Sequence, residues 1–386
     1  MNSPSKILII YDHFSPAWKA GGPIRSIEQM IQQISSDYHL YVLCSAYDYA
    51  ENKVIDNITT DKWVDWQGKA KVYYNSKYNL GIGGFFTRIY NEINPDIIFI
   101  NGLYSLSYNI KPLIAACAFI KKHKQTKLIL SPRGMLHPGA LSQKRYKKKI
   151  FFLVFKLLRI QKYIFWHATD DKEVHFIRSK FRDARITIAG NFPKLSEPLP
   201  TQVKERGKLI MGTIALISPM KNHLEIIKTL HSIKQQITWH IYGPVKDQAY
   251  WDLCNKAIND LPSNIQVVYH GSIPPDKVTL ALEQMQVFIL PSKSENFGHS
   301  ICEALSAGRP VITTDTTPYS NLQHFKAGYT SNLPKLNEGL SKAIQYFADM
   351  EAVEFDSHKE NAINYIHKKM DLQKIISHYQ NLFSIA

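Results

Sequence analysis

Short runs of β-branched and aromatic residues alternate with helical segments along most of this 386-residue chain. This rhythm is typical of a parallel sheet whose strands are joined by crossover helices. In the first half we expect strands at residues 6–11, 39–44, 96–101, 127–131 and 185–189. In the second half we expect strands at residues 209–216, 238–243, 265–270, 286–291 and 310–314. The pattern therefore predicts an α/β fold.

The rhythm breaks once, at residues 190–208, where three prolines, two glycines and mixed charges are typical of a linker. A chain of this length exceeds what one compact core usually holds, so two domains are expected. We place two doubly wound, Rossmann-like domains at residues 1–195 and 205–365. Because ligands collect at the carboxyl ends of parallel strands, we expect these domains to face each other across a cleft.

Four separated cysteines form no C-x-x-C pair, so neither a zinc site nor a disulfide framework is predicted. This usage fits a reducing cytoplasm. The apolar run near the N-terminus, residues 7–10, is too short for the core of a signal peptide. No apolar run has the length of a membrane-spanning helix, so we expect a soluble or peripherally attached protein.

The net charge of +15 is concentrated in one region. Between Asp96 and Asp170 there is no acidic residue, whereas the interval holds fourteen lysines and arginines. Within it, residues 144–166 are first basic and then apolar and aromatic. A single helix there would align one basic stripe, made of Arg145, Lys148, Lys156, Arg159 and Lys162.

Two interpretations of residues 144–166 stay open. The segment is either a domain helix with a solvated basic face or a surface that binds an anionic membrane. Nucleic acid would also be attracted to a basic patch with aromatic residues. Since no recognised nucleic-acid-binding motif accompanies the patch, no nucleic-acid partner is expected.

The stretch "SENFGHSICEALSAGRPVIT", residues 294–313, carries two carboxylates around a glycine. A buried strand is expected to end near Pro291, and a helix to start close to Gly298 and end at Gly308. Glu295 then lies in the loop and Glu303 in the helix. The start of a helix suits a phosphate, and carboxylates accept hydrogen bonds from sugar hydroxyls, so the spacing suits a nucleotide sugar. The alternative is a capping Glu295 and a solvated Glu303.

This segment resembles the E-x7-E signature of retaining, family 4 glycosyltransferases of the GT-B fold, as in bacterial polysaccharide and capsule biosynthesis. Four other stretches resemble the family in the same order: "GGPIRSIEQM" at residues 21–30, "SPRGMLHPGALSQKRYKKK" at 131–149, "ISPMKN" at 217–222 and "TTPYSNLQHFKAGY" at 316–329. The resemblance implies two Rossmann-like domains, acceptor contacts from the first, donor contacts from the second, and a last helix, residues 370–386, that returns to the first.

The resemblance also implies roles for individual residues. Glu303 would bind the ribose of the nucleotide, and Lys221 would neutralise the departing diphosphate. The donor sugar and diphosphate would be surrounded by Glu295, Asn296, Phe297 and Gly298, with the backbone of Gly22 against the phosphates. The alternatives are a helix-start glycine at Gly22 and an exposed structural lysine at Lys221.

Two departures from the family concern the chemistry. Leu216 stands where relatives often carry an arginine, so one positive charge on the leaving group is missing there. Arg133 stands where relatives often carry a histidine, and guanidinium does not give up a proton. Arg133 could instead hold a phosphate or the donor sugar, which makes Glu295, Arg133 and Lys221 the candidate catalytic residues. His137 is a weaker, acceptor-side candidate that a helix would place one turn after Arg133.

Retaining enzymes of this type are thought to pass through an oxocarbenium-like transition state in which the acceptor attacks from the face of the leaving group. The diphosphate itself can take the proton of the acceptor, so no enzyme nucleophile is required. No D-x-D pair and no H-E-x-x-H arrangement occurs in the sequence, so we expect no metal and no cofactor. The donor would be a UDP- or GDP-sugar.

These observations predict a hexosyltransferase that moves a sugar from a nucleotide-sugar donor onto a lipid-linked glycan, in the biosynthesis of cell-surface polysaccharide such as lipopolysaccharide or capsule. It would act in the cytoplasm, peripherally on the inner face of the cytoplasmic membrane. One alternative keeps the fold but not the reaction, as a nucleotide-sugar epimerase or a phosphorylase. The other is a basic membrane- or nucleic-acid-binding module without catalysis.

Overall fold

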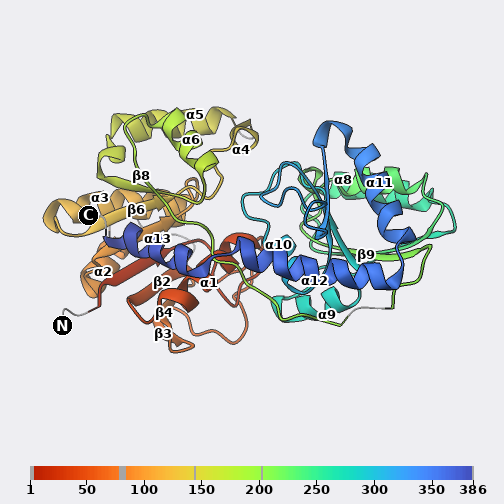
Figure 1. Cartoon of the computed structure of the whole chain (residues 1–386). Coiled ribbons are helices and arrows are strands. Elements are labelled where there is room, and N and C mark those ends of the chain that lie inside the picture. The colour runs from red at the N-terminus through yellow and green to blue at the C-terminus, as the bar shows by residue number, and fades with distance from the viewer. Residues whose placement is uncertain (1–3, 78–83, 143–144, 201–202, 385–386) are drawn as a thin grey trace. The chain divides into compact units, whose positions relative to one another are not determined.

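The chain forms two compact units in a computed structural model that describes residues 4–77, 84–142, 145–200 and 203–384. Unit 1 comprises Met1–Phe192 and Leu372–Ala386, and unit 2 comprises Pro193–Asp371. Each unit is a doubly wound α/β domain with helices on both faces of a sheet (Figure 1). The α/β fold predicted from the alternation of strands and helices is therefore confirmed.

Unit 1 contains an eight-stranded sheet in the order β3-β4-β2-β1-β5-β6-β7-β8. Neighbouring strands are parallel except for the antiparallel pair of β3 and β4. The strands are β1 (Lys6–Ile10), β2 (His39–Ser45), β3 (Trp63–Trp66), β4 (Ala70–Asn75), β5 (Ile97–Asn101), β6 (Lys127–Ser131), β7 (Ile164–Ala168) and β8 (Arg185–Ile188). The helices are α1 (Gly22–Ile34), α2 (Gly84–Ile93), α3 (Lys111–Lys122), α4 (Pro138–Ser142), α5 (Arg145–Leu157), α6 (Asp171–Lys180) and α13 (Leu372–Ser384).

The inner strands β1, β5, β6 and β7 of unit 1 are buried on both faces, as parallel strands covered by helices require. Successive side chains of β1 point to opposite faces, so Leu8 joins the core beneath α2, α3, α5 and α6, whereas Ile9 joins the core beneath α1 and α13. Tyr379 and Phe383 of α13 are buried in that second core. The final helix is thus part of unit 1.

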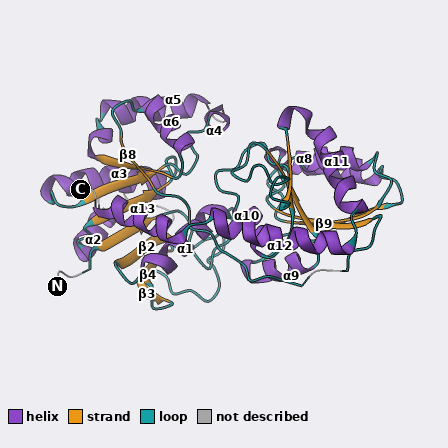
Figure 2. Ribbon diagram, viewed as in Figure 1, coloured by secondary structure: helices purple, strands orange, loops and turns teal. Residues whose placement is uncertain are grey.

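Unit 2 contains a parallel six-stranded sheet in the order β11-β10-β9-β12-β13-β14. The strands are β9 (Lys208–Ile214), β10 (Gln236–Tyr242), β11 (Ile265–Tyr269), β12 (Val287–Leu290), β13 (Val311–Thr314) and β14 (Gly328–Ser331). The helices are α7 (His223–Leu230), α8 (Gln248–Asn259), α9 (Val278–Glu283), α10 (His299–Ser306), α11 (Leu336–Asp349) and α12 (Ala352–Lys369). Figure 2 shows these helices around the strands of the sheet.

The prediction of one helix over residues 144–166 is wrong. α5 ends at Leu157, Arg159 has a left-handed φ of 52°, and β7 begins at Ile164. The run "IFWHA" is rich in β-branched and aromatic residues, and Trp166 within it is fully buried, so it forms a strand of the sheet. The basic stripe expected across residues 145–162 therefore does not form, because its last members lie beyond the helix. Three more strands, β3, β4 and β14, were also not predicted.

The expected linker is partly a fixed piece of unit 2. The Ser196 amide donates to Ser306 Oγ at 2.8 Å, and the Leu199 amide donates to the Ala307 carbonyl at 3.2 Å. Leu195 and Leu199 pack against the core beneath α9, α10 and α12. The boundary between the units falls at Phe192, inside the composition break of residues 190–208 and three residues before the predicted end of the first domain at 195.

Candidate functional site

Unit 2 has one point where its strand order reverses. From β9 the chain builds outward through β10 and β11, then returns to the other side of β9 with β12, β13 and β14. In open α/β sheets ligands bind outside the carboxyl ends of the strands at such a switch point. Lys221 lies in the connection that follows β9, and Glu295 lies in the loop that follows β12. We call these two residues, together with Gly298 and Glu303, the unit 2 switch point.

The two charged candidates are paired. Lys221 Nζ and Glu295 Oε1 form an ion pair, and Ser292 Oγ donates to the same carboxylate oxygen at 2.7 Å. The side chains of Lys221 and Glu295 are only 20% and 12% exposed. Partial burial weakens the screening by water, so this pair is stronger than an ordinary surface pair. Lys221 is thus no solvated structural lysine.

One side-chain and one backbone hydrogen bond hold the two loops together. Asn222 Nδ2 donates to the Pro291 carbonyl at 2.7 Å, and the Lys293 amide donates to the Met220 carbonyl at 2.8 Å. Asn222 has a left-handed φ of 57°, which turns the chain from the short 3-10 helix Pro219–Lys221 into α7. Asparagine tolerates this conformation better than most residues. Sequence reasoning did not single out Asn222, although its place directly after Lys221 was a usable signal.

Gly298 forms the start of α10. Its φ of 73° lies in the left-handed region, and a Cβ there would lie 3.2 Å from Tyr319 Cε2 and 3.3 Å from Ile301 Cδ1. Glycine is therefore needed at this position for two separate reasons. Asn296 and Phe297 precede it, both half-buried, and the Phe297 and His299 ring centroids lie 4.6 Å apart.

Glu303 lies in the second turn of α10 and is only 2% exposed. The alternative of a solvated helix residue is wrong for Glu303, because its carboxylate is enclosed in unit 2. Burial, and after it the charge of Glu303, raises the pKa of the Cys302 thiol. The capping alternative for Glu295 is wrong as well, since among the described residues no side chain caps α10, whose N-cap is Gly298.

In the glycine loop of unit 1, Gly22 is the first residue of α1, which agrees with the alternative of a helix-start glycine. The positive φ of 75° belongs to Gly21. The loop before them is fixed by Asp48, whose carboxylate accepts the amides of Trp18 and Lys19 at 3.0 and 3.1 Å. The phosphate contact of Gly22 stays a prediction.

Arg133 is held in place within unit 1. Its Nε donates to Asn101 Oδ1 at 3.0 Å and its Nη1 donates to Asn191 Oδ1 at 2.5 Å. Arg133 itself has a φ of 51°. These contacts orient the guanidinium without excluding a ligand, so the catalytic role of Arg133 stays a prediction.

The helix that would place His137 one turn after Arg133 does not form. Gly134 has a φ of 76°, and α4 begins only at Pro138. His137 Nδ1 accepts the Gly139 amide at 3.1 Å, and its ring meets Phe176 edge-on at 5.2 Å. These contacts give His137 a structural task at the start of α4, and its acceptor role stays a prediction.

Two further features bear on the predicted chemistry and location. Within residues 4–77, 84–142, 145–200 and 203–384, no three His, Cys, Asp or Glu side chains are grouped to hold a metal ion. The requirement for a metal is not decided by this and stays a prediction. In the same residues no helix combines the length and the hydropathy needed to cross a membrane.

The comparison with known proteins agrees with the geometry of unit 2. Residues 197–369 match the family Glycosyl transferases group 1. The chain is 22% identical over 260 residues to the sulfoquinovosyl transferase SQD2 of Arabidopsis thaliana, covering 65% of this chain and 43% of that protein. It is 27% identical over 217 residues to the poly(ribitol-phosphate) alpha-N-acetylglucosaminyltransferase of Staphylococcus aureus (strain COL), covering 54% of this chain and 41% of that protein. The matches thus span less than half the length of these relatives.

A solved structure extends the likeness to both units. Alr3699/HepE of Anabaena, determined in complex with UDP and glucose, matches with a TM-score of 0.67 over 99% of this chain and 100% of that chain. The sequence identity is 14%, so this match concerns the fold. The match to the Glycosyl transferases group 1 family thus lies within unit 2, and the chain as a whole has the two-domain GT-B fold.

Proposed function

We propose that this protein is a retaining glycosyltransferase that moves a sugar from a UDP- or GDP-sugar onto a glycan. The observation that carries the proposal is the unit 2 switch point. There the ion pair of Lys221 and Glu295, the start of α10 at Gly298 and the buried Glu303 lie on two loops that are bonded to each other.

Each group has a task that its chemistry suits. The first backbone amides of a helix bind phosphate groups, and so does a compact cation. We therefore assign the diphosphate to the start of α10 and to Lys221. A diphosphate would replace Glu295 as the partner of Lys221. Glu295 is then released to accept hydrogen bonds from hydroxyls of the donor sugar, and Glu303 accepts them from the ribose.

The same arrangement supports transfer without an enzyme nucleophile. A fixed cation beside the departing diphosphate stabilises charge that develops in the transition state, which is often the largest catalytic contribution. The diphosphate takes the proton of the acceptor hydroxyl, and the new bond forms on the face it leaves. This route retains the anomeric configuration and, as proposed here, needs no metal ion.

The names of the relatives support a sugar-transfer reaction. One relative is a sulfoquinovosyl transferase, another transfers N-acetylglucosamine, and Alr3699/HepE binds UDP and glucose. Since this chain spans less than half of the two curated relatives, its own donor and acceptor are proposals. UDP is the nucleotide that these names favour.

Calorimetry with UDP, GDP and ADP tests the donor site. We expect one nucleotide to bind the wild type and to bind E303A at least tenfold more weakly, as the loss of a hydrogen bond to a charged group predicts, roughly 1.5–3 kcal/mol. The matched control is E338A, which removes a carboxylate of unit 2 that is 58% exposed and paired with Lys342. Equal affinities of wild type and E303A would overturn the proposal.

Product analysis separates the reaction types. A glycosyltransferase releases nucleoside diphosphate in proportion to glycan product, an epimerase releases a modified nucleotide sugar without acceptor, and a phosphorylase consumes phosphate. The anomeric configuration of the product, determined by NMR spectroscopy, tests retention. Full activity after treatment with a chelator is expected if no metal takes part, and loss of activity that Mg²⁺ or Mn²⁺ restores contradicts the metal-free route.

The surface of α5 supports a lipid-linked acceptor. Four apolar side chains on one face of this helix are exposed to solvent: Tyr146 (81%), Ile150 (62%), Leu153 (59%) and Leu157 (72%). The opposite face is buried, with Phe155 packed against Phe181 at 5.2 Å. At about 100° per residue, exposed lysines flank the apolar face on both sides: Lys147 on one, Lys149 and Lys156 on the other.

An apolar stripe bordered by lysines suits the interface of an anionic membrane, where apolar side chains enter and ammonium groups meet lipid phosphates. Attachment there would bring the protein to an acceptor that is anchored in the cytoplasmic membrane. We expect the wild type to sediment with phosphatidylglycerol vesicles but not with phosphatidylcholine vesicles, and I150S/L153S to lose this binding. The control L280S/V353S changes exposed apolar residues of unit 2 and keeps it. Equal sedimentation of I150S/L153S and wild type would contradict membrane attachment through α5.

A further inference from the structure

Unit 2 contains a cavity beside its switch point that the proposed donor site does not use. Three segments line it: the start of α7 with Asn222, the loop after β12 with Lys293, and residues 333–338, which lead from β14 into α11. All three follow the carboxyl ends of strands, where doubly wound sheets bind ligands. The cavity measures about 440 Å³, within the range of about 300 to 1,000 Å³ of small-molecule sites.

The cavity and the proposed donor site belong to opposite faces of the sheet. Ile226 of α7 and Leu340 of α11 pack in the core on one face, whereas Ile301 of α10 packs in the core on the other. The donor site uses α10, and the cavity is lined by the first turns of α7 and α11. Neither Gly298 nor Glu303 is among the described residues that line it. A ligand in this cavity is therefore distinct from the nucleotide assigned to α10.

Hydrogen bonds fix the walls of the cavity. The Lys293 amide donates to the Met220 carbonyl at 2.8 Å, which ties the loop after β12 to the connection after β9. The carboxylate of Asp315 accepts the Leu333 amide and Asn332 Nδ2, both at 3.1 Å, which holds the segment after β14. A site whose walls are held before the ligand arrives loses less conformational entropy on binding.

The lining has an excess of positive charge. Its two carboxylates are each paired with a lysine of the same helix: Glu225 with Lys228 at 2.8 Å, and Glu338 with Lys342 at 2.7 Å. In the part of the chain that the structure describes, no carboxylate lies within ion-pair distance of the other two charged groups of the lining, Lys293 and Lys335. Lys335 acts on Glu338 only at longer range, where it lowers the pKa of that carboxylate less than Lys342 does. Two ammonium groups are thus left for a bound anion.

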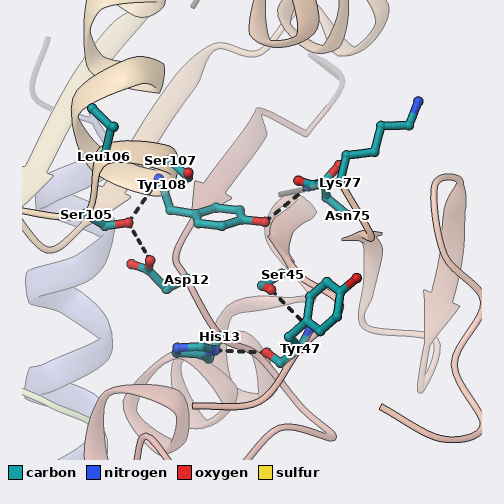
Figure 3. A pocket seen from close by; sticks show the side chains of 10 residues that line it. All are labelled: Asp12, His13, Ser45, Tyr47, Asn75, Lys77, Ser105, Leu106, Ser107 and Tyr108. Atoms are coloured by element: carbon teal, nitrogen blue, oxygen red, sulfur yellow. Dashed lines mark hydrogen bonds between the residues drawn. The ribbon is translucent and has the colours of Figure 1, made fainter. Parts of the chain in front are cut away.

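The cavity of unit 1 has no such excess. It lies at the switch point of that unit, where β1 lies between β2 and β5, and it measures about 200 Å³ (Figure 3). Its lining holds one carboxylate, Asp12, and one ammonium group, Lys77. Hydroxyl groups, the Asn75 amide and the His13 imidazole supply most of the remaining polar groups. Charge therefore favours an anion in the cavity of unit 2 over one in the cavity of unit 1.

We propose that the cavity of unit 2 binds a sugar that carries a phosphate or carboxylate group. Lys293 and Lys335 meet the anionic group, because each ammonium can donate only to ligand oxygens. The Asn337 side chain exchanges hydrogen bonds with hydroxyls, and Leu333 and Leu336 give apolar surface to the C–H groups of the ring. The proposal goes beyond the proposed function and does not depend on it.

Calorimetry with the whole chain tests the proposal, with glucose 6-phosphate, glucuronate, glucose and inorganic phosphate as probes. We expect at least one of the two anionic sugars to bind the wild type. Glucose and inorganic phosphate should each bind roughly tenfold more weakly, since each lacks part of the contacts. K293M/K335M removes both charges, keeps most of the aliphatic stems and should weaken binding of the anionic sugar by a similar factor. Added salt should also weaken it.

The matched control is K256M/K277M, which makes the same change of charge at two exposed lysines of unit 2 outside the lining. It should keep wild-type affinity, and both double variants should keep the wild-type melting temperature. The proposal is overturned if neither anionic sugar binds the wild type, if K293M/K335M binds as the wild type does, or if K256M/K277M loses as much affinity. Inorganic phosphate that binds as tightly as both sugars would show a simple anion site and overturn the assignment to a sugar.

Competition with the nucleotide shows whether the two sites are separate. We expect nucleotide and anionic sugar to bind together. If the nucleotide displaces the sugar from the wild type and from K293M/K335M alike, the sugar lies in the donor site and the proposal is overturned. A protein that binds the anionic sugar but no nucleotide keeps the cavity as a site and loses the proposed transferase, and the reverse result does the opposite.

Longer ligands distinguish two sources of the same chemistry, a free charged sugar and a charged unit of a glycan chain. Oligosaccharides of glucuronate that bind at least roughly tenfold more tightly than glucuronate assign the cavity to a glycan chain. Equal or weaker binding assigns it to a free small ligand. Either result supports an anionic sugar as the ligand of the cavity.

Discussion

The two switch points have the same topology and different chemistry. In unit 2 the loops after β9 and β12 bring a cation against a carboxylate, and a helix start lies beside them. In unit 1 the loops after β1, β2, β4 and β5 enclose hydroxyls, an amide and one carboxylate. The topology places both sets of residues at the carboxyl ends of the strands, and the residues just beyond the strands decide the chemistry of each place.

Each unit also buries a histidine, and the two differ in their partners. In unit 1, His167 Nε2 donates to the Ala189 carbonyl and Nδ1 accepts from Ser131 Oγ, both at 2.8 Å. In unit 2, His223 is fully buried, and in the described residues neither ring nitrogen has a hydrogen-bond partner. The first histidine is part of a polar network, whereas the second is mainly a packing residue.

The largest expected effect concerns Lys221. K221A removes the cation beside the diphosphate and should lower kcat by about 10² to 10³, the usual loss for one preorganised electrostatic group. K221R keeps a positive charge and should retain part of the activity that K221A loses. The control K228A removes an exposed lysine of α7 and should leave kcat unchanged. Steady-state kinetics check the contrast, and a wild-type kcat for K221A would contradict it.

The glycines of the two switch points should respond alike. G298A forces a φ of 73° on alanine, and G102A forces a φ of 96° with a Cβ 2.8 Å from Asn109 Oδ1. Each should lower the free energy of unfolding by about 1–3 kcal/mol. G84A is the control, because Gly84 has no positive φ and no atom within 4 Å of an added Cβ. Denaturant titrations measure the free energy of unfolding of all three variants. If G298A and G102A are as stable as G84A, the expected backbone strain is contradicted.

The histidines should make stability depend on pH. Burial lowers the pKa of His167 from 6.5 to about 3, so below pH 6.5 the unfolded chain binds a proton that the folded chain does not. Stability is therefore fully present above pH 6.5 and falls by about 1.4 kcal/mol per pH unit below it, for each such group. Burial first, and then Lys221, lowers the pKa of His223 to about 4, with the same sign.

Two variants separate these contributions. H223F should make the free energy of unfolding less dependent on pH and should change it little at pH 7, since no hydrogen bond is lost. H167F should also reduce the pH dependence, but it should lower the free energy of unfolding at every pH, because Ser131 and Ala189 lose their hydrogen-bond partner. Denaturant titrations at pH 7.5 and 5.5 compare them. A pH dependence in H223F as steep as in the wild type would contradict the assignment.

The smallest expected effect concerns the ion pair itself. E295Q frees Lys221 from its carboxylate, so UDP should bind more tightly, by about twofold to tenfold, as an interaction near 1 kcal/mol predicts. Transfer should nevertheless fall, because Glu295 no longer accepts from the donor sugar as a carboxylate. E338Q is the exposed control. Weaker UDP binding by E295Q would show that Glu295 does not compete for Lys221.

Much of unit 2 was predictable because its signals are local. The helix start near Gly298 and the loop position of Glu295 follow from a strand, a glycine and a helix within about twenty residues. The burial of Glu303 was not predictable from its neighbours in sequence. Nor was the contact between Lys221 and Glu295, which are 74 residues apart.

Unit 1 shows where local patterns mislead. The basic and aromatic residues 144–166 have a helical pattern, yet Trp166 is buried in the sheet and only residues up to Leu157 form the helix. The sequence left open whether the apolar side of this segment faces the core or a membrane, and Ile150 and Leu153 of α5 are exposed. Two faces of α5 are apolar, and hydrophobic periodicity cannot tell which one the core takes.

By itself, the sequence determined the alternation of strands and helices, the division into two units and the loop that places Glu295 before α10, because propensity, glycine conformation and periodicity act over a few residues. Only the tertiary structure decided that Lys221 meets Glu295, and that Asp12 and Asn75 share one cavity. Those meetings depend on strand order in the sheet, which brings together residues far apart in the chain, and no local pattern records it.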